Sequence, residues 1–303
     1  MLDRMSLLFR FRTIAEVGSL RRAAETLNVA QPALSRSLSQ LEKHYGQALL
    51  ERHARGVRPT AFGERLLSTV SRLSRDWELA EAELAGNNPG AEGRLRLHAG
   101  PLWSSVVLPA VVPRLQMNFP NLTVEMTPST GGSLPALLDG RIDASFGGLY
   151  APERNHPQLA ARAFGNIRDR VTARADHPIQ SCDQEDYAAV HRYPWIIYAA
   201  DPIYEAETLH AVMERTGALP QVRVRSSSLL AIFRLLQGGD YLCILPDAAV
   251  RGIPGKPLQT VPIDLGHRNS ETGVLYRRTL MHYPPMRALL DECAAYFTQY
   301  GVP

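Results

Sequence analysis

The sequence predicts an α/β protein in which an all-α N-terminal domain is joined by a long helix to two similar α/β lobes. Apolar residues recur at helical spacing through the first 86 residues, and NNPGAEG at 87–93 then interrupts the pattern. Beyond that break, apolar strands alternate with amphipathic helices. A chain of 303 residues with 45% hydrophobic and 21% charged residues has room for two or three folded domains.

The composition excludes several classes of protein. No run of about 18 apolar residues occurs, so we expect no membrane-spanning helix, and the first residues do not resemble a signal peptide. Cys182, Cys243 and Cys293 are few, odd in number and widely spaced, which favours neither a disulfide framework nor a metal site. We therefore expect a cytoplasmic protein without a membrane partner or a metal.

Positive charge is concentrated in the first fifth of the chain. Residues 1–58 carry ten Lys and Arg against five Asp and Glu, a balance of +5, whereas the whole chain carries +3. Such a local excess attracts a polyanion. The N-terminal domain is therefore the expected site of nucleic-acid binding.

Three helices are expected within residues 1–46. Apolar residues recur at helical spacing in the first, which ends at Gly18. Ser19 is a good N-cap for a short second helix, LRRAAETL, and Asn28 is suited to end it in a left-handed conformation. The third helix begins at QPALS, with a proline in its first turn, where a missing N–H costs nothing.

The third helix has two chemically different faces. Leu34, Leu38 and Leu41 fall at i, i+4 and i+7 and should form a buried stripe. At about 100° per residue, the opposite face is small, polar and basic. Its members are Pro32, Ser35, Arg36, Ser39 and Lys43.

A hairpin and a long helix should follow the third helix. ALLERHARGVRPT is a short apolar strand followed by a turn at Gly56, with Arg52, Arg55 and Arg58 around it. Thr60 can cap a helix that runs to about residue 85. Apolar residues along it form a heptad seam suited to pairing with a second helix, although a seam can also pack on its own domain. The seam comprises Leu66, Val70, Leu73, Trp77, Ala80 and Leu84.

From residue 94 the alternating pattern predicts a parallel sheet with helices on its faces. LRLHAG, LTVEMTP and IDASFGGL are strands separated by helical segments, and YPWIIYA, VRVRS and YLCILP repeat the rhythm in a second unit. No internal sequence repeat is apparent. Two similar α/β lobes are expected.

The second and third helices, within about residues 20–39, have the spacing of a helix-turn-helix. A DNA major groove admits one helix, and short polar side chains let that helix approach base edges closely. Arg36 is the best candidate for a bidentate contact to guanine, and Gln31 or Ser39 for other base edges or phosphates. A hairpin rich in arginine would contact the adjacent backbone or minor groove. A helical bundle with a solvated face is the alternative, which the local charge disfavours.

The stretch FRTIAEVGSLRRAAETLNVAQPALSRSLSQLEKHYGQALLERHARGVRPTAFGERLL resembles the winged helix-turn-helix of LysR-type transcriptional regulators. ADHP at 175–178 and LLQGGDYLCILP at 235–246 also resemble landmarks of that family. The resemblance implies a linker helix and a two-lobed, periplasmic-binding-protein-like (Rossmann-like) sensor. It also places Gln31, Pro32, Ser35 and Arg36 at positions that contact operator DNA, and Arg52 and Arg55 in the wing.

One position departs from the family pattern. Ala30 stands where Ser or Thr is common, which removes an N-cap worth about 1 kcal/mol. The expected domains are a winged helix-turn-helix at 1–58, a linker and dimerisation helix at 59–86 and an effector-binding domain at 94–303. Within the last, lobe I comprises 94–164 and 268–303, and lobe II comprises 165–267.

A ligand-binding site is expected where strands of the lobes end, because open α/β sheets bind ligands beyond the carboxyl ends of their strands. The candidates offer hydroxyls, backbone donors or close approach, although each serine could instead cap a helix and Trp103 could simply pack. Leu102 stands where Ser or Thr is common in the family, which disfavours a simple carboxylate ligand. The candidate residues are Leu102, Trp103, Ser104, Ser105, Ser129, Thr130, Gly131, Gly147, Tyr198 and Ser227.

No catalytic motif such as GxSxG, HExxH or a Walker sequence is present, so we expect a regulator rather than an enzyme. The expected function is sequence-specific binding of promoter DNA, modulated by a small-molecule effector in the cleft between the lobes, with no other cofactor. The expected assembly is a homodimer through the linker helix that pairs into a tetramer, and RNA polymerase is a further candidate partner. The alternative is a metabolite-binding or solute-binding protein whose N-terminal helices serve protein contacts only.

Overall fold

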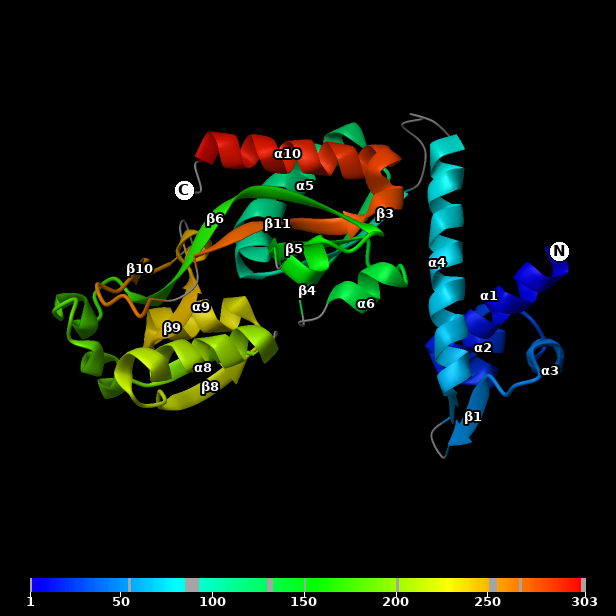
Figure 1. Ribbon diagram of the computed structural model, residues 1–303, viewed down its shortest axis with the longest axis horizontal. Coiled ribbons are helices and arrows are strands. Elements are labelled where there is room, and N and C mark those ends of the chain that lie inside the picture. The colour runs from blue at the N-terminus through cyan, green and yellow to red at the C-terminus, as the bar shows by residue number, and fades with distance from the viewer. Residues whose placement is uncertain are drawn as a thin grey trace. The chain divides into compact units, whose positions relative to one another are not determined.

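The computed structural model divides into two compact units, an N-terminal unit made chiefly of residues 1–84 and a C-terminal unit (Figure 1). The structure describes residues 2–53, 56–84, 93–129, 133–149, 151–199, 202–250, 255–266 and 269–300.

The N-terminal unit consists of helices and one hairpin, in the predicted order. A two-stranded antiparallel sheet pairs Leu50 with Pro59 and His53 with Gly56. The elements are α1 (Leu2–Val17), α2 (Leu20–Thr26), α3 (Gln31–Tyr45), β1 (Leu50–His53), β2 (Gly56–Pro59) and α4 (Ala61–Leu84).

The turns between these helices follow from the residues that the sequence supplies. Gly18 ends α1 with a φ of +68°, and the next residue, Ser19, accepts a hydrogen bond from the backbone N–H of Arg22 at the start of α2. Asn28 adopts the left-handed conformation with a φ of +50°. Both caps and the left-handed asparagine confirm the predictions made from the sequence.

Two apolar clusters hold the N-terminal unit together. Leu41 of α3 packs with residues of α1 and α4, and Leu34 packs with α1, α2 and the hairpin. Both leucines are fully buried, and each such side chain stabilises the fold by about 1.5–3 kcal/mol. The fully or nearly buried members of the two clusters are Leu7, Leu8, Phe11, Leu41, Leu49, Val70, Ile14, Ala23, Ala24, Leu34 and Val57.

Two glycines allow backbone segments to approach one another in this unit. A Cβ on Gly56, where φ is +133°, would lie 2.2 Å from the carbonyl oxygen of Gly18. A Cβ on Gly63, in the first turn of α4, would lie 2.0 Å from the carbonyl oxygen of Leu49. Since real Cβ atoms do not come so close to a backbone oxygen, glycine is required at both positions.

The apolar seam of α4 divides into a buried and an exposed part. Val70 is buried in the N-terminal unit, whereas Leu73 is 42%, Trp77 61% and Leu84 87% exposed. The seam therefore packs on its own domain at its start and presents apolar side chains to solvent toward its end.

The strands of the C-terminal unit form a seven-stranded sheet, in the order β10-β6-β11-β5-β3-β4 with β9 beside β6, and a two-stranded sheet of β7 and β8. The strands are β3 (Gly93–Ala99), β4 (Leu122–Pro128), β5 (Ala144–Gly148), β6 (Leu159–Arg174), β7 (Trp195–Tyr198), β8 (Val222–Ser226), β9 (Cys243–Pro246), β10 (Leu258–Thr260) and β11 (Asn269–Arg277).

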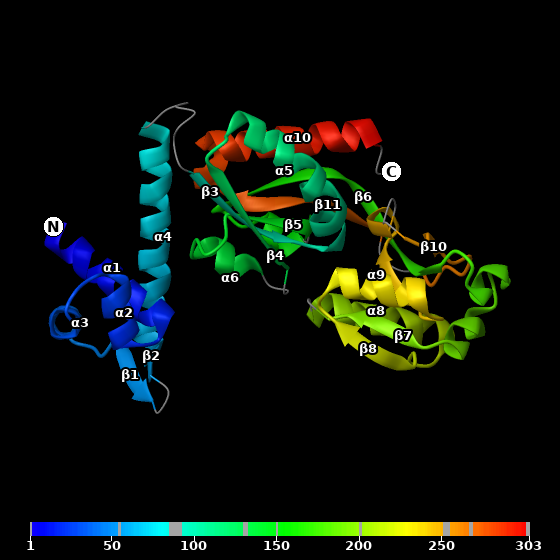
Figure 2. The ribbon, with the colours of Figure 1, turned by 180° about the vertical axis from the view of Figure 1, so that it is seen from behind.

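Helices lie between the strands along the chain. Figures 1 and 2 show α5 and α10 on the same side of the β3, β5 and β11 strands, and α8 and α9 beside β7 and β8. The α-helices are α5 (Leu108–Asn118), α6 (Ser133–Leu138), α7 (Ala151–Arg154), α8 (Pro202–Thr216), α9 (Leu229–Gly238) and α10 (Pro284–Tyr300). A π-helical turn, η1 (Trp103–Val107), precedes α5, and short 3-10 turns are η2 (Pro178–Ser181), η3 (Tyr187–Arg192), η4 (Asp247–Val250) and η5 (Arg278–His282).

The large sheet is mixed, which corrects the prediction of a parallel sheet. β3 is parallel to β4 and β5, and β7 is parallel to β8, but β11 is antiparallel to both β5 and β6, and β9 and β10 are antiparallel to β6. Parallel neighbours need a long crossover, usually a helix. The chain between β10 and β11 contains no helix in its described part, so the alternating rule fails there.

The strand β6 is shared by both halves of the C-terminal unit. Its first part pairs with β11, from Leu159 opposite Arg277, and its last part pairs with β10, ending with Arg174 opposite Leu258. The expected boundary between lobes I and II, at 164/165, lies inside this continuous strand.

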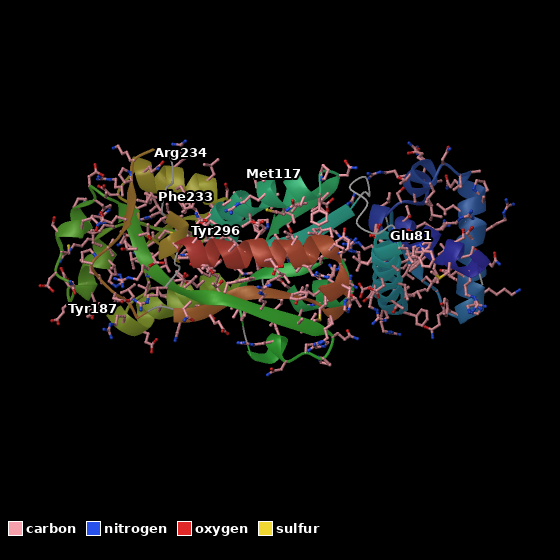
Figure 3. All side chains as sticks on the ribbon, turned by 90° about the horizontal axis from the view of Figure 1, so that it is seen from above. Glu81, Met117, Tyr187, Phe233, Arg234 and Tyr296 are labelled. Carbon is pink, nitrogen blue, oxygen red and sulfur yellow. The ribbon has the colours of Figure 1, made fainter. Side chains whose placement is uncertain are left out.

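The helices of this unit bury one face each. On α9, Phe233 is buried among apolar residues of β7 and β9, whereas the next residue, Arg234, is exposed, and at the end of α5 Met117 is also exposed (Figure 3).

Among the described helices, none is long and apolar enough to cross a membrane. The described residues also hold no group of three His, Cys, Asp or Glu placed to bind a metal ion.

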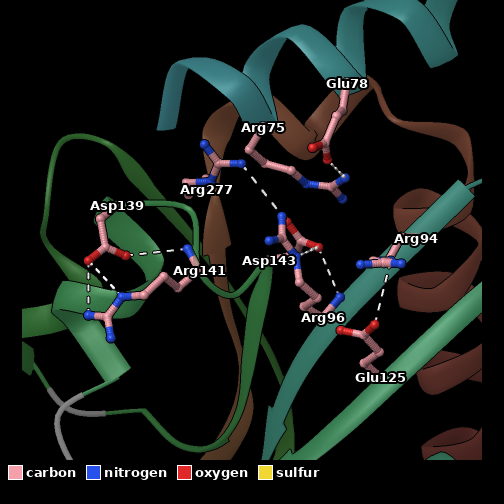
Figure 4. A network of polar contacts seen from close by, with 9 residues as sticks. All are labelled: Arg75, Glu78, Arg94, Arg96, Glu125, Asp139, Arg141, Asp143 and Arg277. Atoms are coloured by element: carbon pink, nitrogen blue, oxygen red, sulfur yellow. Dashed lines mark hydrogen bonds and ion pairs between the residues drawn. The ribbon is translucent and has the colours of Figure 1, made fainter. Parts of the chain in front are cut away.

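An ion-pair cluster is buried in the C-terminal unit. Asp143, fully buried just before β5, accepts a hydrogen bond from the backbone N–H of Arg96 at 2.9 Å, and its other oxygen lies 3.9 Å from the guanidinium of Arg277 (Figure 4). The Arg96 guanidinium lies 3.6 Å from the same carboxylate. A buried carboxylate needs such partners, so the cluster ties β3, β5 and β11 together.

Candidate nucleic-acid interface and ligand-binding edge

The helix α3 exposes the face that the sequence assigned to DNA. Leu34 and Leu41 are fully buried on one side, and Leu38 is half-buried beside them. The predicted contact residues lie on the opposite side. Pro32, Arg36, Ser39 and Lys43 are exposed and Ser35 is half-exposed, as is expected for a helix that packs through one stripe.

The start of α3 has no side-chain cap. Ala30 precedes the helix in an extended conformation and makes no side-chain cap, and Gln31, the first helical residue, is exposed. Pro32 has no N–H, and the N–H groups of Ala33 and Leu34 donate to the carbonyl of Ala30 at 2.9 and 3.2 Å, so the helix start offers a phosphate little beyond the N–H of Gln31. A hollow of about 380 Å³, which the sequence did not predict, lies beside this end. It is lined by Arg21, Ala24, Glu25, Asn28, Val29, Ala30 and Gln31.

The hairpin is attached to three other segments. The backbone N–H of Val57 donates to the carbonyl of Gly18 at 2.9 Å, and that of Leu49, just before β1, donates to the side chain of Glu42 on α3 at 2.9 Å. The Thr60 hydroxyl donates to the carbonyl of Ala48 and accepts from the first turn of α4, which confirms its predicted cap. The hairpin is thus held beside α3 as a wing.

The cations of α3 and the wing remain available to a polyanion. Arg52 and Arg58 are exposed on β1 and β2, while Arg55 lies outside the described residues. Within the described part of the chain, Arg36, Lys43, Arg52 and Arg58 form no ion pair, in contrast to Arg21, whose guanidinium lies 3.4 Å from the carboxylate of Glu25.

Three strand ends of the C-terminal unit meet at one edge. The N–H of Gly100, after β3, donates to the carbonyl of Phe146 on β5 at 2.9 Å, and the N–H of Ser129, after β4, donates to the carbonyl of Ala99 at 3.1 Å. A Cβ on Gly147 would meet no atom within 4 Å. The geometry therefore brings Ser129 and Gly147 to the predicted edge, with open space beside the glycine. Thr130 and Gly131 lie outside the described residues.

Two residues that the sequence predicted to line this edge lie in the core instead. Leu102 is 2% and Trp103 1% exposed. The Trp103 indole packs against Phe146, Phe164 and Phe297 and donates its N–H to the hydroxyl of Thr272 at 2.9 Å. Neither side chain is open to a ligand. Trp103 therefore packs in the core, which is the alternative that the sequence left open, and Leu102 packs there as well.

The serines that follow are half-buried and hydrogen bonded within their own turn. The hydroxyl of Ser104 donates to the carbonyl of Gly100 at 3.0 Å, and that of Ser105 donates to the carbonyl of Pro101 at 2.6 Å. Each hydroxyl oxygen retains the capacity to accept a hydrogen bond. The hydroxyl proton of each serine is already donated to a backbone carbonyl.

The candidates from the second half of the unit differ in exposure. Tyr198 is buried and meets the ring of Tyr204 edge-on. Ser227 is exposed. Its neighbour Ser226 accepts a hydrogen bond from the backbone N–H of Ser228, and the hydroxyl of Ser228 caps α9. The structure therefore leaves Ser227 open to a ligand, whereas the ring of Tyr198 belongs to the core.

Side chains that the sequence did not single out support this edge. Thr272 of β11 accepts from Trp103 and donates to the carbonyl of Gly147 at 3.1 Å. On the neighbouring strands, the Ser145 hydroxyl donates to that of Ser133, which lies 3.4 Å from Nδ1 of His98. His98 lies on β3, whereas Ser133 lies on α6, so their meeting depends on the fold.

The buried cysteines have no reactive surroundings. Burial raises the pKa of the Cys293 thiol to about 12, and this effect is opposed by the charge of Arg162 and supported, more weakly, by that of Glu292. Burial also raises the pKa of Cys243, helped by the charge of Asp169. Both thiols therefore stay protonated, as expected for core residues.

Two family models match this chain, one over its N-terminal part and one over most of the remainder. Residues 5–64 match the bacterial regulatory helix-turn-helix protein of the lysR family, and residues 88–298 match the LysR substrate binding domain. The chain is 30% identical to the SDS degradation transcriptional activation protein of Pseudomonas sp. (strain ATCC 19151), over 79% of this chain and 78% of that protein. It is 26% identical to the transcriptional regulator GltR of Bacillus subtilis (strain 168), over 81% and 80%.

Solved structures share the fold over nearly the whole chain. A full-length OxyR variant from Pseudomonas aeruginosa gives a TM-score of 0.70 at 21% identity and covers 95% of this chain and 94% of that chain. Full-length CbnR complexed with its target DNA gives 0.64 at 20% identity, over 96% and 99%. At these identities the likeness concerns the fold.

Proposed function

The chain belongs to the LysR family of bacterial transcriptional regulators, and we propose that the exposed face of α3 and the wing read its operator while the strand-end edge of the C-terminal unit binds its effector. Family membership gives the DNA-binding and substrate-binding domains. The observation that carries the DNA proposal is the exposed small, basic face of α3 opposite the buried Leu34 and Leu41.

On the proposed interface, each contact has a chemical role. Arg36, exposed and without an ion-pair partner among the described residues, suits a bidentate bond to guanine, and Ser35, Ser39 and Gln31 suit other base edges or phosphates. Pro32 brings the start of the helix close to the groove without a side-chain donor. Arg52, Arg55 and Arg58 of the wing would contact the DNA backbone or the minor groove irrespective of sequence.

The assembly is proposed from the exposed part of the α4 seam. Leu73, Trp77, Ala80 and Leu84 recur at heptad spacing and face solvent in the described chain. Pairing of two such helices would place two α3 helices on a two-fold-related operator. Association of two dimers into a tetramer and contact with RNA polymerase extend this proposal.

The effector proposal rests on the strand ends. Ser104, Ser105 and Ser129 offer hydroxyls and Gly147 offers open space, with Ser227 from the second half of the unit. Thr130 and Gly131 join them by sequence, whereas Leu102, Trp103 and Tyr198 are buried in the core. Such a ligand would shift the populations of DNA-bound states, so the protein acts by binding rather than by catalysis.

The DNA proposal is tested by selection. The wild-type protein should enrich a duplex with two related half-sites from a random library, and Arg36→Ala should lose about 1–3 kcal/mol of discrimination between that enriched duplex and an unselected one. Arg72 of α4, which is half-exposed, provides a control, because Arg72→Ala removes the same charge outside the proposed interface. If Arg36→Ala and Arg72→Ala discriminate equally well, α3 does not read the operator through Arg36.

A further inference from the structure

A serine interrupts the apolar stripe by which α3 packs on α1. Ser37 is 6% exposed, and its hydroxyl oxygen lies 2.7 Å from Nη1 of Arg10, a half-buried residue of α1, which donates a hydrogen bond to it. The same hydroxyl donates its own proton to the carbonyl of Ala33, one turn earlier, at 3.0 Å. Both hydrogen-bonding roles of the serine are therefore filled, one of them by a charged group from another helix.

The position of this bond on α3 is significant. Ser37 follows Arg36 directly, and at about 100° per residue it points to the buried side while Arg36 points away from it. α1 and α3 also share an apolar cluster, to which Phe11 and Leu41 belong. Apolar contacts are not directional, whereas a guanidinium–hydroxyl bond forms only at one rotation and one height of α3 relative to α1.

Reading a base edge demands such accuracy. A bidentate arginine–guanine contact needs its groups within about 0.5 Å and 10–20° of the productive geometry. Attraction to phosphates falls off slowly with distance and survives a small shift of the helix. A device that fixes the rotation of α3 should therefore change sequence discrimination more than non-specific DNA binding.

We propose that Arg10 is a positioning residue for operator recognition. Through Ser37 it fixes the rotation and height of α3, and thereby sets how Arg36 meets a base edge, without itself contacting DNA. This inference rests on the proposed role of the α3 face.

The experiment must separate this role from a contribution of the Arg10 charge. Ser37→Ala removes the acceptor and keeps every charge, Arg10→Met removes the donor and one charge, and the double variant removes both. Arg4, exposed on the same helix, provides the control, because Arg4→Met removes an equal charge without this bond. Affinities of the full-length proteins are measured for the duplex that the wild type enriches and for an unselected duplex, over a range of salt concentrations.

We expect Ser37→Ala to weaken binding of the enriched duplex by about tenfold, because without the bond α3 holds the productive orientation only about a tenth of the time. Binding of the unselected duplex should stay within about twofold, with the salt dependence unchanged. Arg10→Met should show the same loss of discrimination, and the double variant should discriminate no worse than Arg10→Met, because both changes break one bond. Arg4→Met should leave discrimination at the wild-type value. Thermal unfolding of each variant checks that α3 remains folded. If Ser37→Ala does not fold, Arg10→Met tests the same prediction.

The inference is overturned if Ser37→Ala retains wild-type discrimination, if it weakens both duplexes alike, or if the losses of the two single variants add in the double variant. If the wild-type protein enriches no duplex, the proposed role of the α3 face fails first, and the positioning role falls with it.

Discussion

The α3 face and the strand-end edge of the C-terminal unit are both proposed binding sites, yet they are built in opposite ways. On α3, the contact residues come from one helix, are exposed and form no ion pair within the described chain. At the strand-end edge, the residues come from several strands and turns, and their polar atoms are hydrogen bonded to the chain itself, as with Ser104 and Thr272. The DNA-reading surface is thus available before its partner arrives, whereas a ligand at the edge must add to or replace existing bonds.

This difference has an energetic reason. A charged surface that must meet a highly charged polymer loses little by staying solvated until contact. A small ligand offers few atoms, so its site has to be shaped and dry, which requires buried aromatic and polar groups behind it. Substitutions on the exposed face of α3 should accordingly change DNA binding without changing stability, whereas substitutions of buried groups behind the strand-end edge should lower stability.

The largest effect is expected from Trp103→Ala. The indole is fully buried, packs on three phenylalanine rings and donates a hydrogen bond to Thr272, so its loss should destabilise the C-terminal unit by about 3–5 kcal/mol. Chemical denaturation followed by circular dichroism measures this change. Unaltered unfolding would show that Trp103 is not part of the core and would reopen its role as a ligand contact.

Leu34→Ala should come next, at about 2–5 kcal/mol. The side chain is fully buried on α3, on the opposite side from Arg36, so the substitution leaves a cavity between α1, α2 and the hairpin. Denaturation should show the loss, while Arg36→Ala should unfold like the wild type. Equal destabilisation by Leu34→Ala and Arg36→Ala would contradict the division of α3 into a structural and a reading face.

Arg52→Ala should have a smaller effect that does not depend on DNA sequence. Arg52 is exposed on β1, and removing one phosphate contact should reduce the slope of log affinity against log salt by about one. Gel-shift titrations with the enriched and the unselected duplex at several salt concentrations measure it. A loss confined to the enriched duplex would move Arg52 from backbone contact to base readout.

The smallest effect is expected from Ser104→Ala. Among the described residues its hydroxyl bonds only within its own turn, to the carbonyl of Gly100 and more distantly to that of Pro101, so its removal should change the stability by less than about 1 kcal/mol. Thermal unfolding of the two proteins provides the comparison. A larger loss would mean that the hydroxyl supports the strand-end edge as a structural group, as the Trp103 indole does.

The sequence predicted the N-terminal unit more fully than the C-terminal one. The faces of α3 follow from periodicity within fifteen consecutive residues, and Gly18, Ser19 and Asn28 signal their turns locally. The Arg10–Ser37 bond was not predicted, because it joins residues 27 apart whose meeting depends on how α1 packs on α3.

At the strand-end edge, local patterns were insufficient. Leu102 and Trp103 were assigned to the ligand-binding edge, but Trp103 lies in a π-helical turn that Leu102 directly precedes, and both side chains are buried in the core. The direction of β11 was also missed, because a strand's own residues do not record whether its neighbours run parallel. Residues far apart in the chain, such as Thr272 and Gly147, then complete the edge.

The continuous strand β6 implies that the halves of the C-terminal unit cannot be produced as separate proteins. A polypeptide cut at 164/165 would end inside β6 and would separate β11 from β5 and from residues 159–163 of β6, with which β11 is hydrogen bonded. Unpaired edges of this kind recruit strands from other molecules, so each isolated fragment should aggregate. Expressed together, the two fragments should instead recover solubility by reassembling the strand.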